Sequence, residues 1–266
     1  MVVKEFKTRG SQLSNPHDST SYMFAQEGYV VLPAHFSPSE AAEVSKEIRL
    51  IQKTPEVDVY FDRSGQLRRL EHFTYLSDFL TEVNARIEAL LGQITGEPYT
   101  LFKDKFNYKP PGGEGFSAHY DGVFLFQTGD GQPRKGWYEY ASRFVSVLVA
   151  VDAFTEENGA LEIARAHFGD FDSLLSKTRQ DGSPHLKSEV EEAEHFTPIV
   201  MREGGVAVFK NTCPHRSGPN RSNGSRGSLY LTYSPRSEGA HYDAYFEDKK
   251  KSGNENKALT GPVFEG

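Results

Sequence analysis

The feature that most constrains the fold is a change of pattern at Gly96. Before it, apolar residues recur at helical spacing. After it, short apolar or alternating segments are separated by clusters of Gly, Pro and Asp, which is typical of strands. The expected strands cover residues 99–108, 142–154, 160–163, 196–201, 206–209 and 228–233. Because helices precede a run of strands and no alternating β-α-β units occur, the sequence predicts an α+β protein or a β-barrel with a helical flank.

The flank before Gly96 contains recognisable helix signals. Residues 22–33 look like a helix end that runs into a short strand. Ser37 and Pro38 then supply an N-cap and a proline just inside the helix EAAEVSKEIRLI. A second helix is expected over residues 77–93, with its apolar side chains on one side.

A chain of 266 residues is long enough for one domain with a full core. We therefore expect residues 1–266 to form a single domain. Its expected parts are a loosely ordered arm (1–20), a helical flank (21–96), a β-barrel core (97–236) and a polar tail (237–266) in which the lysine run 249–251 is solvated.

Charge and cysteine content narrow the choice of partners. The net charge of -7 opposes nonspecific attraction to nucleic acid or anionic lipid, so we expect a small-molecule partner, no nucleic acid and no membrane. Cys213 is the only cysteine, which excludes an intramolecular disulfide and a thiolate metal cluster and fits a reducing compartment. The N-terminus has no apolar signal region, so a cytoplasmic location is expected. The sequence is compatible with a homodimer but does not determine the oligomeric state.

A candidate metal site begins with the triplet His119-Tyr120-Asp121. On a strand, residues two apart point to the same face, so the imidazole and the carboxylate could bind one ion together. Such a triplet is common by chance and usually marks a surface pair. His215, 94 residues after Asp121, lies at the boundary of a non-adjacent strand and could supply a third ligand. Two imidazoles and one carboxylate are the ligand set of a non-haem ferrous site with open coordination positions.

Arg226 follows His215 by eleven residues and could hold an anionic co-substrate beside the metal. The far carboxylate of a chelating keto acid needs a bidentate cation, which a guanidinium supplies better than an ammonium. The hydroxyl of Ser217 could assist Arg226. Arg226 and Ser217 would then bind a dicarboxylate next to the metal.

The strand 99–108 leads through a glycine- and proline-rich loop towards His119. Its alternation places Lys103, Lys105 and Asn107 on one face. Lys105 and Asn107 are therefore candidates to line the metal cavity. An ordinary strand with one face in solvent would show the same alternation. For Lys103 alone, a position on such a solvated face is an acceptable interpretation.

Together, these candidate residues and the segments around them resemble a known family. From residue 24 to 233 the chain is similar to the phytanoyl-CoA dioxygenase family of iron(II)/2-oxoglutarate oxygenases, which includes the ectoine hydroxylases. The matching segments are GYVVLP, HYD, NGALEI, GGVAVF and HRSGPNRSNGSR, of which the last is the most specific. The resemblance implies a mostly β double-stranded β-helix, a jelly-roll or cupin-like barrel with flanking N-terminal helices. It also implies Fe(II), 2-oxoglutarate and dioxygen as cofactor and co-substrates.

The resemblance assigns roles to individual residues. It makes His119, Asp121 and His215 the metal ligands, with Arg226 and Ser217 on the 2-oxoglutarate carboxylate and Asn107 on the same co-substrate. Two features qualify it: residues 164–167 lack the Pro-Gly turn that many members have there, and Asp121 is retained where related halogenases have a small residue. The retained carboxylate favours hydroxylation over halogenation.

The long segment between Asp121 and Arg143 is a candidate substrate lid. Each of its side chains could equally pack the loop or face solvent. The predicted substrate contacts there and elsewhere are Lys103, Tyr120, Arg134, Trp137, Tyr140 and Arg165. Their character favours a small polar metabolite with an anionic or zwitterionic group. The run KFNYKPPGGEGFSAHYDG is similar to bacterial family members that hydroxylate 2-aminoethylphosphonate.

Parts of this pattern are also compatible with other functions. Within the same chemistry, the substrate could instead be an amino acid or a natural-product intermediate. Outside it, a cupin-like barrel could be a non-catalytic binding module, or a metal-dependent isomerase or hydrolase. The intact ligands and Arg226 argue against a binding module whose metal site has decayed. A metal-dependent isomerase or hydrolase generally has no need of an arginine placed for a dicarboxylate.

Overall fold

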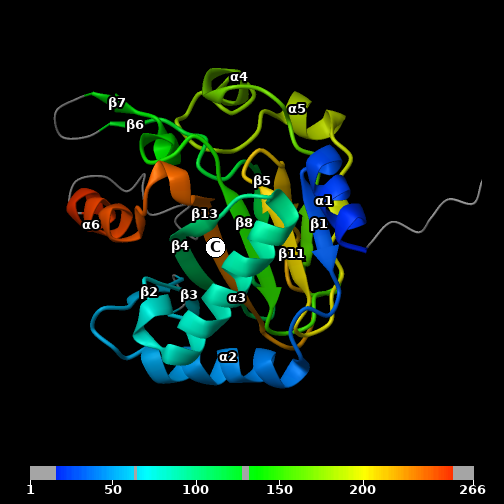
Figure 1. The fold of residues 1–266 in the computed structure, drawn as a ribbon, viewed down its shortest axis with the longest axis vertical. Helices are drawn as coiled ribbons and strands as arrows, with labels where there is room; N and C mark the ends of the chain where they lie inside the picture. The colour runs from blue at the N-terminus through cyan, green and yellow to red at the C-terminus, as the bar shows by residue number, and fades with distance from the viewer. Residues whose placement is uncertain (1–15, 63–64, 128–131, 254–266) are drawn as a thin grey trace, which may run out of the picture.

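The computed structural model describes residues 16–62, 65–127 and 132–253, and its strands form two main antiparallel sheets (Figure 1). The large sheet has the order β1-β11-β8-β13-β4-β3-β2, with β1 (Tyr29–Leu32), β2 (Asp58–Phe61), β3 (Leu67–Glu71), β4 (Tyr99–Lys109), β8 (Val145–Ala150), β11 (Val206–Lys210) and β13 (Arg226–Pro235). The small sheet has the order β10-β9-β12-β5, with β5 (Phe116–His119), β9 (Leu161–Ile163), β10 (Thr197–Pro198) and β12 (His215–Ser217). A separate hairpin pairs β6 (Phe126–Gln127) with β7 (Pro133–Arg134).

Helices cover the outer face of the large sheet and the edges of the molecule (Figure 1). They are α1 (Pro16–Glu27), α2 (Pro38–Ile51), α3 (Asp78–Thr95), α4 (Phe171–Leu175), α5 (Ser188–Ala193) and α6 (Tyr242–Gly253), with short 3-10 turns η1 (Thr74–Leu76), η2 (Gly136–Glu139) and η3 (Arg236–Glu238). Among the residues described, no helix combines the length and the apolar character needed to cross a membrane.

The predicted start of α2 is confirmed. The Ser37 hydroxyl accepts from the backbone N–H of Glu40, the Glu40 carboxylate accepts from the Ser37 N–H, and Pro38 occupies the first turn. The second predicted helix is α3, which ends at Gly96 with a φ of 79°, a left-handed conformation that glycine adopts without strain. Both helices bury their apolar sides in the main core.

The two faces of the large sheet have different characters because side chains alternate along each strand. On β13, Leu229 and Leu231 join the helix-covered core, whereas Tyr230 joins the core between the two sheets. Register places Lys105 of β4 opposite Tyr230, and Asn107 opposite Ser228. The basic and amide side chains of β4 therefore face the small sheet, which is the arrangement predicted for a double-stranded β-helix.

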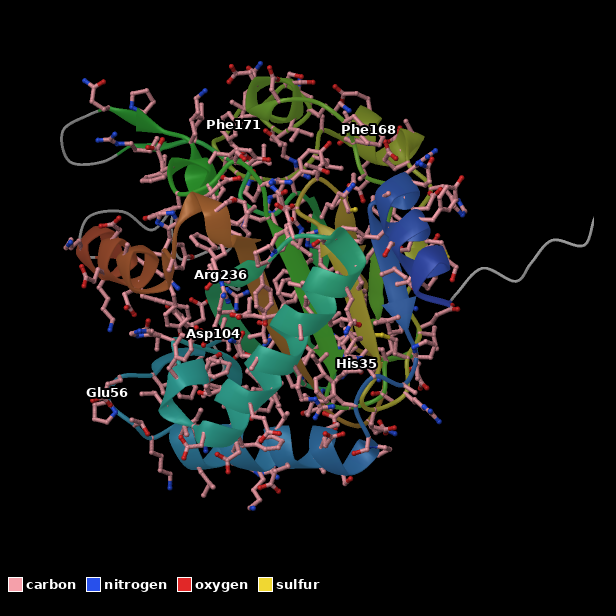
Figure 2. All side chains as sticks on the ribbon, in the orientation of Figure 1. His35, Glu56, Asp104, Phe168, Phe171 and Arg236 are labelled. Carbon is pink, nitrogen blue, oxygen red and sulfur yellow. The ribbon has the colours of Figure 1, made fainter. Side chains whose placement is uncertain are left out.

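The buried carboxylate of Asp104 on β4 ties two neighbouring segments to the sheet (labelled in Figure 2). It accepts from the backbone N–H groups of His72, Phe73 and Thr74, at 2.7–2.9 Å, and from the Tyr242 hydroxyl, at 2.8 Å. These bonds hold the turn after β3 and the start of α6 against β4.

Three expected boundaries need correction. Helix α1 begins at Pro16, so the end of the expected arm 1–20 is helical, while residues 1–15 lie outside the described part. The flank contains the hairpin β2–β3, which its charged residues concealed. The expected polar tail contains α6, whose Tyr242, Tyr245 and Phe246 are buried because they recur at helical spacing within a charged sequence.

The lysine run at 249–251 is only partly solvated. Lys249 is 5% exposed and forms an ion pair with Glu71 of β3, whereas Lys250 and Lys251 are exposed. A run of like charges on a helix points in different directions, so one member can be buried while its neighbours face solvent. The rest of the expected tail, from residue 254, lies outside the described residues.

Candidate active site

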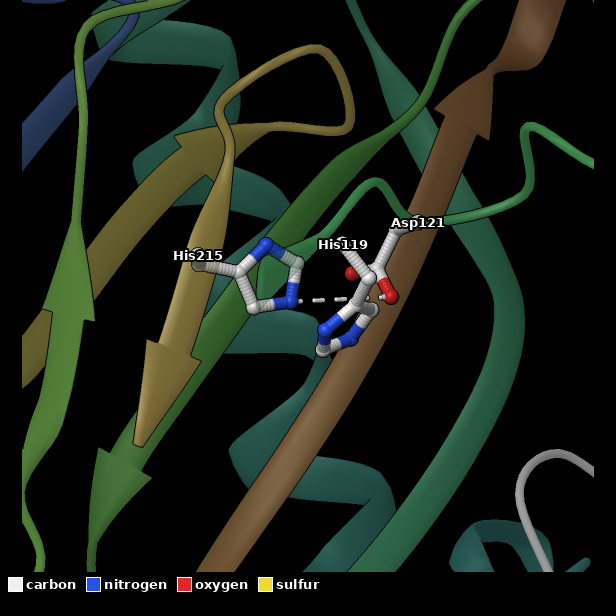
Figure 3. Close-up of side chains that lie close together, drawn as sticks. All are labelled: His119, Asp121 and His215. Atoms are coloured by element: carbon white, nitrogen blue, oxygen red, sulfur yellow. Dashed lines mark ion pairs between the residues drawn. The ribbon is translucent and has the colours of Figure 1, made fainter. Parts of the chain in front are cut away.

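Three side chains from two parts of the small sheet converge between the sheets (Figure 3). His119 is the last residue of β5, and His215 is the first residue of the neighbouring strand β12, directly opposite it in register. Their ring centroids are 4.2 Å apart. Asp121 follows two residues after His119, and one ligand atom from each residue lies within 4.8 Å of the other two. The structure therefore brings together the three predicted ligands.

The histidine tautomers are set by backbone carbonyls. Nδ1 of His119 lies 2.8 Å from the carbonyl of Ser117, and Nδ1 of His215 lies 3.1 Å from that of Cys213. Since a carbonyl can only accept, each Nδ1 carries the proton and each Nε2 keeps its lone pair. This is the usual outer contact of a metal-binding histidine.

The carboxylate of Asp121 is held from the large sheet. Its Oδ2 accepts from the hydroxyls of Ser146 on β8, at 2.8 Å, and Tyr230 on β13, at 2.7 Å. Its Oδ1 lies 3.9 Å from Nε2 of His215, as the dashed line in Figure 3 marks. One oxygen is thus fixed by hydrogen bonds, and the other points towards the imidazoles.

The protonation states suit a metal site. Burial, followed by the proximity of His215, lowers the pKa of His119 to about 3, and burial also lowers the pKa of His215. Burial alone would raise the pKa of Asp121, but His215, Lys105 and His119 hold it well below its usual range. Two neutral imidazoles and one carboxylate are the donor set of a ferrous site that leaves about three of six positions open.

A second group of side chains lies at the start of β13. Arg226 donates through Nη1 to the Gly159 carbonyl at 2.7 Å, and its guanidinium stacks 4.1 Å from the Phe154 ring centroid. Its Nε is buried and has no hydrogen-bond partner in the described part of the protein. Ser217 is the next inward-facing residue after His215 on β12. These are the two residues predicted to bind a dicarboxylate.

Lys109, which was not among the residues predicted from the sequence, joins this group. It lies opposite Arg226 in register, and its ammonium donates to the Ser217 hydroxyl at 2.8 Å and to the Gly218 carbonyl at 2.6 Å. Burial, followed by the charges of Arg226 and Arg68, lowers the pKa of Lys109 to about 7. Two buried cations side by side favour an anion between them. The strand was predicted to end at Tyr108, one residue too early to include Lys109.

Between the two groups lie the inward-facing residues of β4. The half-buried Lys105 ammonium is 3.9 Å from the ring centroid of Tyr230, and Asn107 accepts from Nε of Arg69 at 3.0 Å. Lys103 is buried and donates to the Tyr245 hydroxyl at 2.9 Å. Burial lowers the pKa of Lys105 to about 7, although Asp121 partly offsets this effect.

A family model described as phytanoyl-CoA dioxygenase (PhyH) matches residues 24–228. The chain belongs to the phytanoyl-CoA dioxygenase family. It is therefore a dioxygenase, as the resemblance implied.

Two relatives have names that specify a substrate. A methylphosphonate hydroxylase from Gimesia maris is 28% identical over 250 residues, which cover 88% of this chain and 87% of that protein. A 2-aminoethylphosphonate dioxygenase from an uncultured bacterium is 31% identical over 165 residues, which cover 62% of this chain and 57% of that protein.

Solved structures confirm the double-stranded β-helix. The ectoine hydroxylase EctD from S. alaskensis matches this phytanoyl-CoA dioxygenase family member with a TM-score of 0.64 and 20% identity, covering 83% of this chain and 77% of that one. The epimerase SnoN from nogalamycin biosynthesis, solved with Fe3+ and alpha ketoglutarate, matches with a TM-score of 0.64 and 18% identity, covering 82% of this chain and 83% of that one.

Several predicted substrate contacts point elsewhere in this dioxygenase. Tyr120 lies in a small core away from its neighbours His119 and Asp121, because alternation turns it to the other face, and its hydroxyl bonds His167. Arg165 is on the outer surface, bonded to the Gln26 carbonyl. The structure therefore does not bring Tyr120 and Arg165 together with the three predicted metal ligands.

The predicted lid residues also form contacts away from the three predicted metal ligands. Tyr140 donates to Asp248 of α6 at 2.9 Å, and Arg134 lies on the hairpin β6–β7, 4.0 Å from Glu139. Trp137 is buried in an aromatic cluster, with its ring 5.7 Å from the ammonium of Lys103. Of the six predicted substrate contacts, only Lys103 and Trp137 lie near the inward face of β4.

Proposed function

We propose that this dioxygenase binds Fe(II) through Nε2 of His119, Nε2 of His215 and Oδ1 of Asp121, and hydroxylates a small organophosphonate with 2-oxoglutarate and dioxygen as co-substrates. The observation that carries this proposal is the convergence of these three ligand atoms within 4.8 Å of one another, in the protonation states that a metal requires. When bound, ferrous iron supplies the activation of dioxygen, with 2-oxoglutarate converted to succinate and carbon dioxide.

The protein contributes orientation to this chemistry. The carbonyls of Ser117 and Cys213 hold the imidazoles with Nε2 towards the metal position. The hydroxyls of Ser146 and Tyr230 hold Asp121 by one oxygen and leave the other for the metal. The contacts of His215 and Asp121 are buried, and that of His119 with Ser117 is exposed, so the ligands are ordered by the protein before any substrate arrives.

The pair of cations at the start of β13 suits the distal carboxylate of 2-oxoglutarate. Arg226 offers a guanidinium with one buried, unpartnered N–H, and Lys109 and Ser217 add an ammonium and a hydroxyl beside it. Asn107 and Lys105 occupy the inward-facing positions between this pair and the metal ligands, where the co-substrate would extend. This supports co-substrate roles for Arg226, Ser217 and Asn107. Lys105, which was predicted together with them, lies beside Tyr230 and Asp121, where the co-substrate and the substrate would meet.

The substrate class is supported by charge and by the relatives. The inner wall of β4 carries Lys103, Lys105 and Lys109, which suits an anionic metabolite. The two relatives described above are named for methylphosphonate and 2-aminoethylphosphonate. A phosphonate is consistent with the lysines on β4 and with the names of the two relatives. Hydroxylation of an amino acid or a natural-product intermediate is the alternative that the same assay would reveal.

The test is spectroscopic and then chemical. Apoprotein mixed with Fe(II) and 2-oxoglutarate without oxygen should develop a visible charge-transfer absorption, and His215→Ala should abolish it. In air, methylphosphonate or 2-aminoethylphosphonate should stimulate succinate formation and yield a hydroxylated product by phosphorus NMR. The absence of both the absorption and succinate would refute the oxygenase. Normal succinate formation with an amino acid and none with a phosphonate would refute only the substrate class.

The proposal includes a single-domain protein in the cytoplasm. The lone Cys213 is fully buried, and burial raises the pKa of its thiol to about 12, so it would stay an inert thiol in a reducing compartment. Cell fractionation tests the location, and size-exclusion chromatography tests the predicted homodimer.

A further inference from the structure

A cluster of ionised side chains lies next to Lys105, on the side away from Arg226. It consists of Arg69 and Glu71 from β3, Lys103 from β4 and Lys249 from α6, and we call it the basic cluster. Register places Glu71 opposite Lys105 and Arg69 opposite Asn107, so β3 extends the inner wall that β4 and β13 form. Three cations thus surround one carboxylate at the end of the inner wall of β4 opposite the proposed 2-oxoglutarate site.

The carboxylate of Glu71 is the centre of the cluster. It is 0% exposed; Oε1 lies 3.4 Å from Nη1 of Arg69 and 3.6 Å from Nζ of Lys103, and Oε2 forms a closer ion pair with Lys249. Burial alone would raise its pKa, but Lys103, Lys249 and Arg69 together lower it to about 2. Glu71 is therefore a carboxylate at neutral pH, and its closest ammonium comes from α6.

The basic cluster adjoins the metal ligands through two hydroxyl residues of β13. Tyr230, which binds Asp121, lies under the ammonium of Lys105. Thr232 lies opposite Lys103, and its hydroxyl is 3.4 Å from that of Ser146, the second residue that binds Asp121. Lys103 and Lys105 therefore flank the metal site on the Asp121 side. Arg226 and Lys109 flank it on the other side.

We infer that the basic cluster with Lys105 is the subsite for the doubly charged headgroup of the substrate, with Lys105 as the direct contact and Lys249 as a positioning residue. This inference rests on the proposed function. Lys249 pairs with Oε2 of Glu71, while Arg69 and Lys103 share Oε1. Three cations therefore face a single carboxylate, and the cluster keeps an excess of positive charge beside Lys105 for an incoming anion. A dianionic phosphonate suits such a site better than a monoanionic carboxylate, because the attraction grows with the ligand's charge.

Four variants test the inference in protein loaded with Fe(II) and 2-oxoglutarate without oxygen. The probe is methylphosphonate, followed by the change in the visible absorption and by broadening of its phosphorus NMR signal near the paramagnetic metal. Lys103→Met and Lys249→Met should weaken methylphosphonate binding by about tenfold or more. Glu71→Gln, which removes the negative charge, should strengthen it. Lys249→Arg should bind methylphosphonate like the unmodified protein.

The matched control is Lys46→Met, which removes an exposed lysine paired with Glu43 on α2. In all variants the absorption formed by 2-oxoglutarate should persist, since Arg226 and Lys109 are unchanged. Should a variant not fold, the unmodified protein still decides the question: methylphosphonate should bind at least about tenfold more tightly than acetate. Equal binding of the two ligands, or equal weakening by Lys103→Met and Glu71→Gln, would overturn the subsite. If the unmodified protein formed no visible absorption with Fe(II) and 2-oxoglutarate, the proposed function would be overturned instead.

Discussion

At the scale of single residues, the site depends on contacts that the ligands make behind the metal position. Asp121 is 5% exposed, and its pKa stays well below its usual range because His215, Lys105, His119 and the Tyr230 hydroxyl together outweigh the effect of burial. Its orientation comes from Ser146 and Tyr230, which lie on different strands of the opposite sheet. The sequence predicted the ligands from their spacing. It could not predict the hydroxyls, because serine and tyrosine in buried strands occur for many reasons.

Tyr230→Phe tests whether the hydroxyl contact tunes the metal site. The ring and its packing remain, but Asp121 loses one of two donors, so Fe(II) affinity should fall by about 10- to 100-fold. Anaerobic Fe(II) titration, followed by the absorption with 2-oxoglutarate, measures this. The matched control is Tyr233→Phe, which removes a buried hydroxyl bonded to Asn84 on the helix-covered face. An equal loss of Fe(II) affinity in both variants would show that the effect is general loosening.

Arg226→Ala should mainly weaken 2-oxoglutarate. A charge-assisted bidentate contact of this kind contributes ~2–4 kcal/mol, so the concentration of 2-oxoglutarate at half-maximal absorption should rise by at least about tenfold while Fe(II) affinity changes little. Lys109→Met should act in the same direction. If Arg226→Ala bound 2-oxoglutarate normally, the role assigned to this arginine would be wrong.

At the scale of elements, the sequence predicted the helices and strands whose apolar residues recur at the spacing expected for one buried face or for a wholly buried strand. The strands β4, β8, β11 and β13 alternate or are wholly apolar between glycine- and proline-rich turns, and α2 and α3 carry clear caps. The hairpin β2–β3 and helix α6 were missed for a common reason. Arg69, Glu71 and Lys249 are buried by pairing with one another, and burial of charged residues through mutual pairing obscures the hydrophobic pattern of the apolar residues between them.

Helix α6 should be an integral part of the fold and not a dispensable tail. Phe246 is fully buried among aromatic neighbours, so Phe246→Ala should lower the free energy of unfolding by about 3–5 kcal/mol. Urea denaturation measures this. The control Lys251→Ala removes an exposed side chain of the same helix and should change the stability by less than about 1 kcal/mol. A small loss from Phe246→Ala would mean that α6 is not packed as described.

At the scale of the whole molecule, the metal position joins the two sheets. The imidazoles belong to the small sheet, and the hydroxyls that orient Asp121 belong to the large one. The overall topology followed from the resemblance, but the contacts that orient Asp121 did not, because Ser146 and Tyr230 come from two strands far apart in the sequence, β8 and β13. His215 is buried and His119 is half-buried, and this burial favours the neutral form of both imidazoles. Folding and metal binding should therefore both weaken as the pH falls.

The metal-free protein should lose stability as the pH falls. The pKa of His119 is lowered in the folded state from 6.5 to about 3 by burial and His215, and that of His215 is also lowered by burial. Between these pH values the unfolded chain binds a proton at His119 and the folded chain does not. The free energy of unfolding should therefore decrease below about pH 6.5, by up to about 1.4 kcal/mol per pH unit for each such imidazole.

Urea denaturation at several pH values, with the metal removed by a chelator, measures this slope. His119→Gln should make it shallower, because glutamine does not titrate. The exposed His195→Gln should leave it unchanged. Saturating Fe(II) without oxygen should raise stability most near neutral pH, by about 2.7 kcal/mol at a hundredfold excess over its dissociation constant, and less in acid, where protons compete for the imidazoles. A slope identical in His119→Gln and the unmodified protein would contradict the burial of a neutral imidazole at this position.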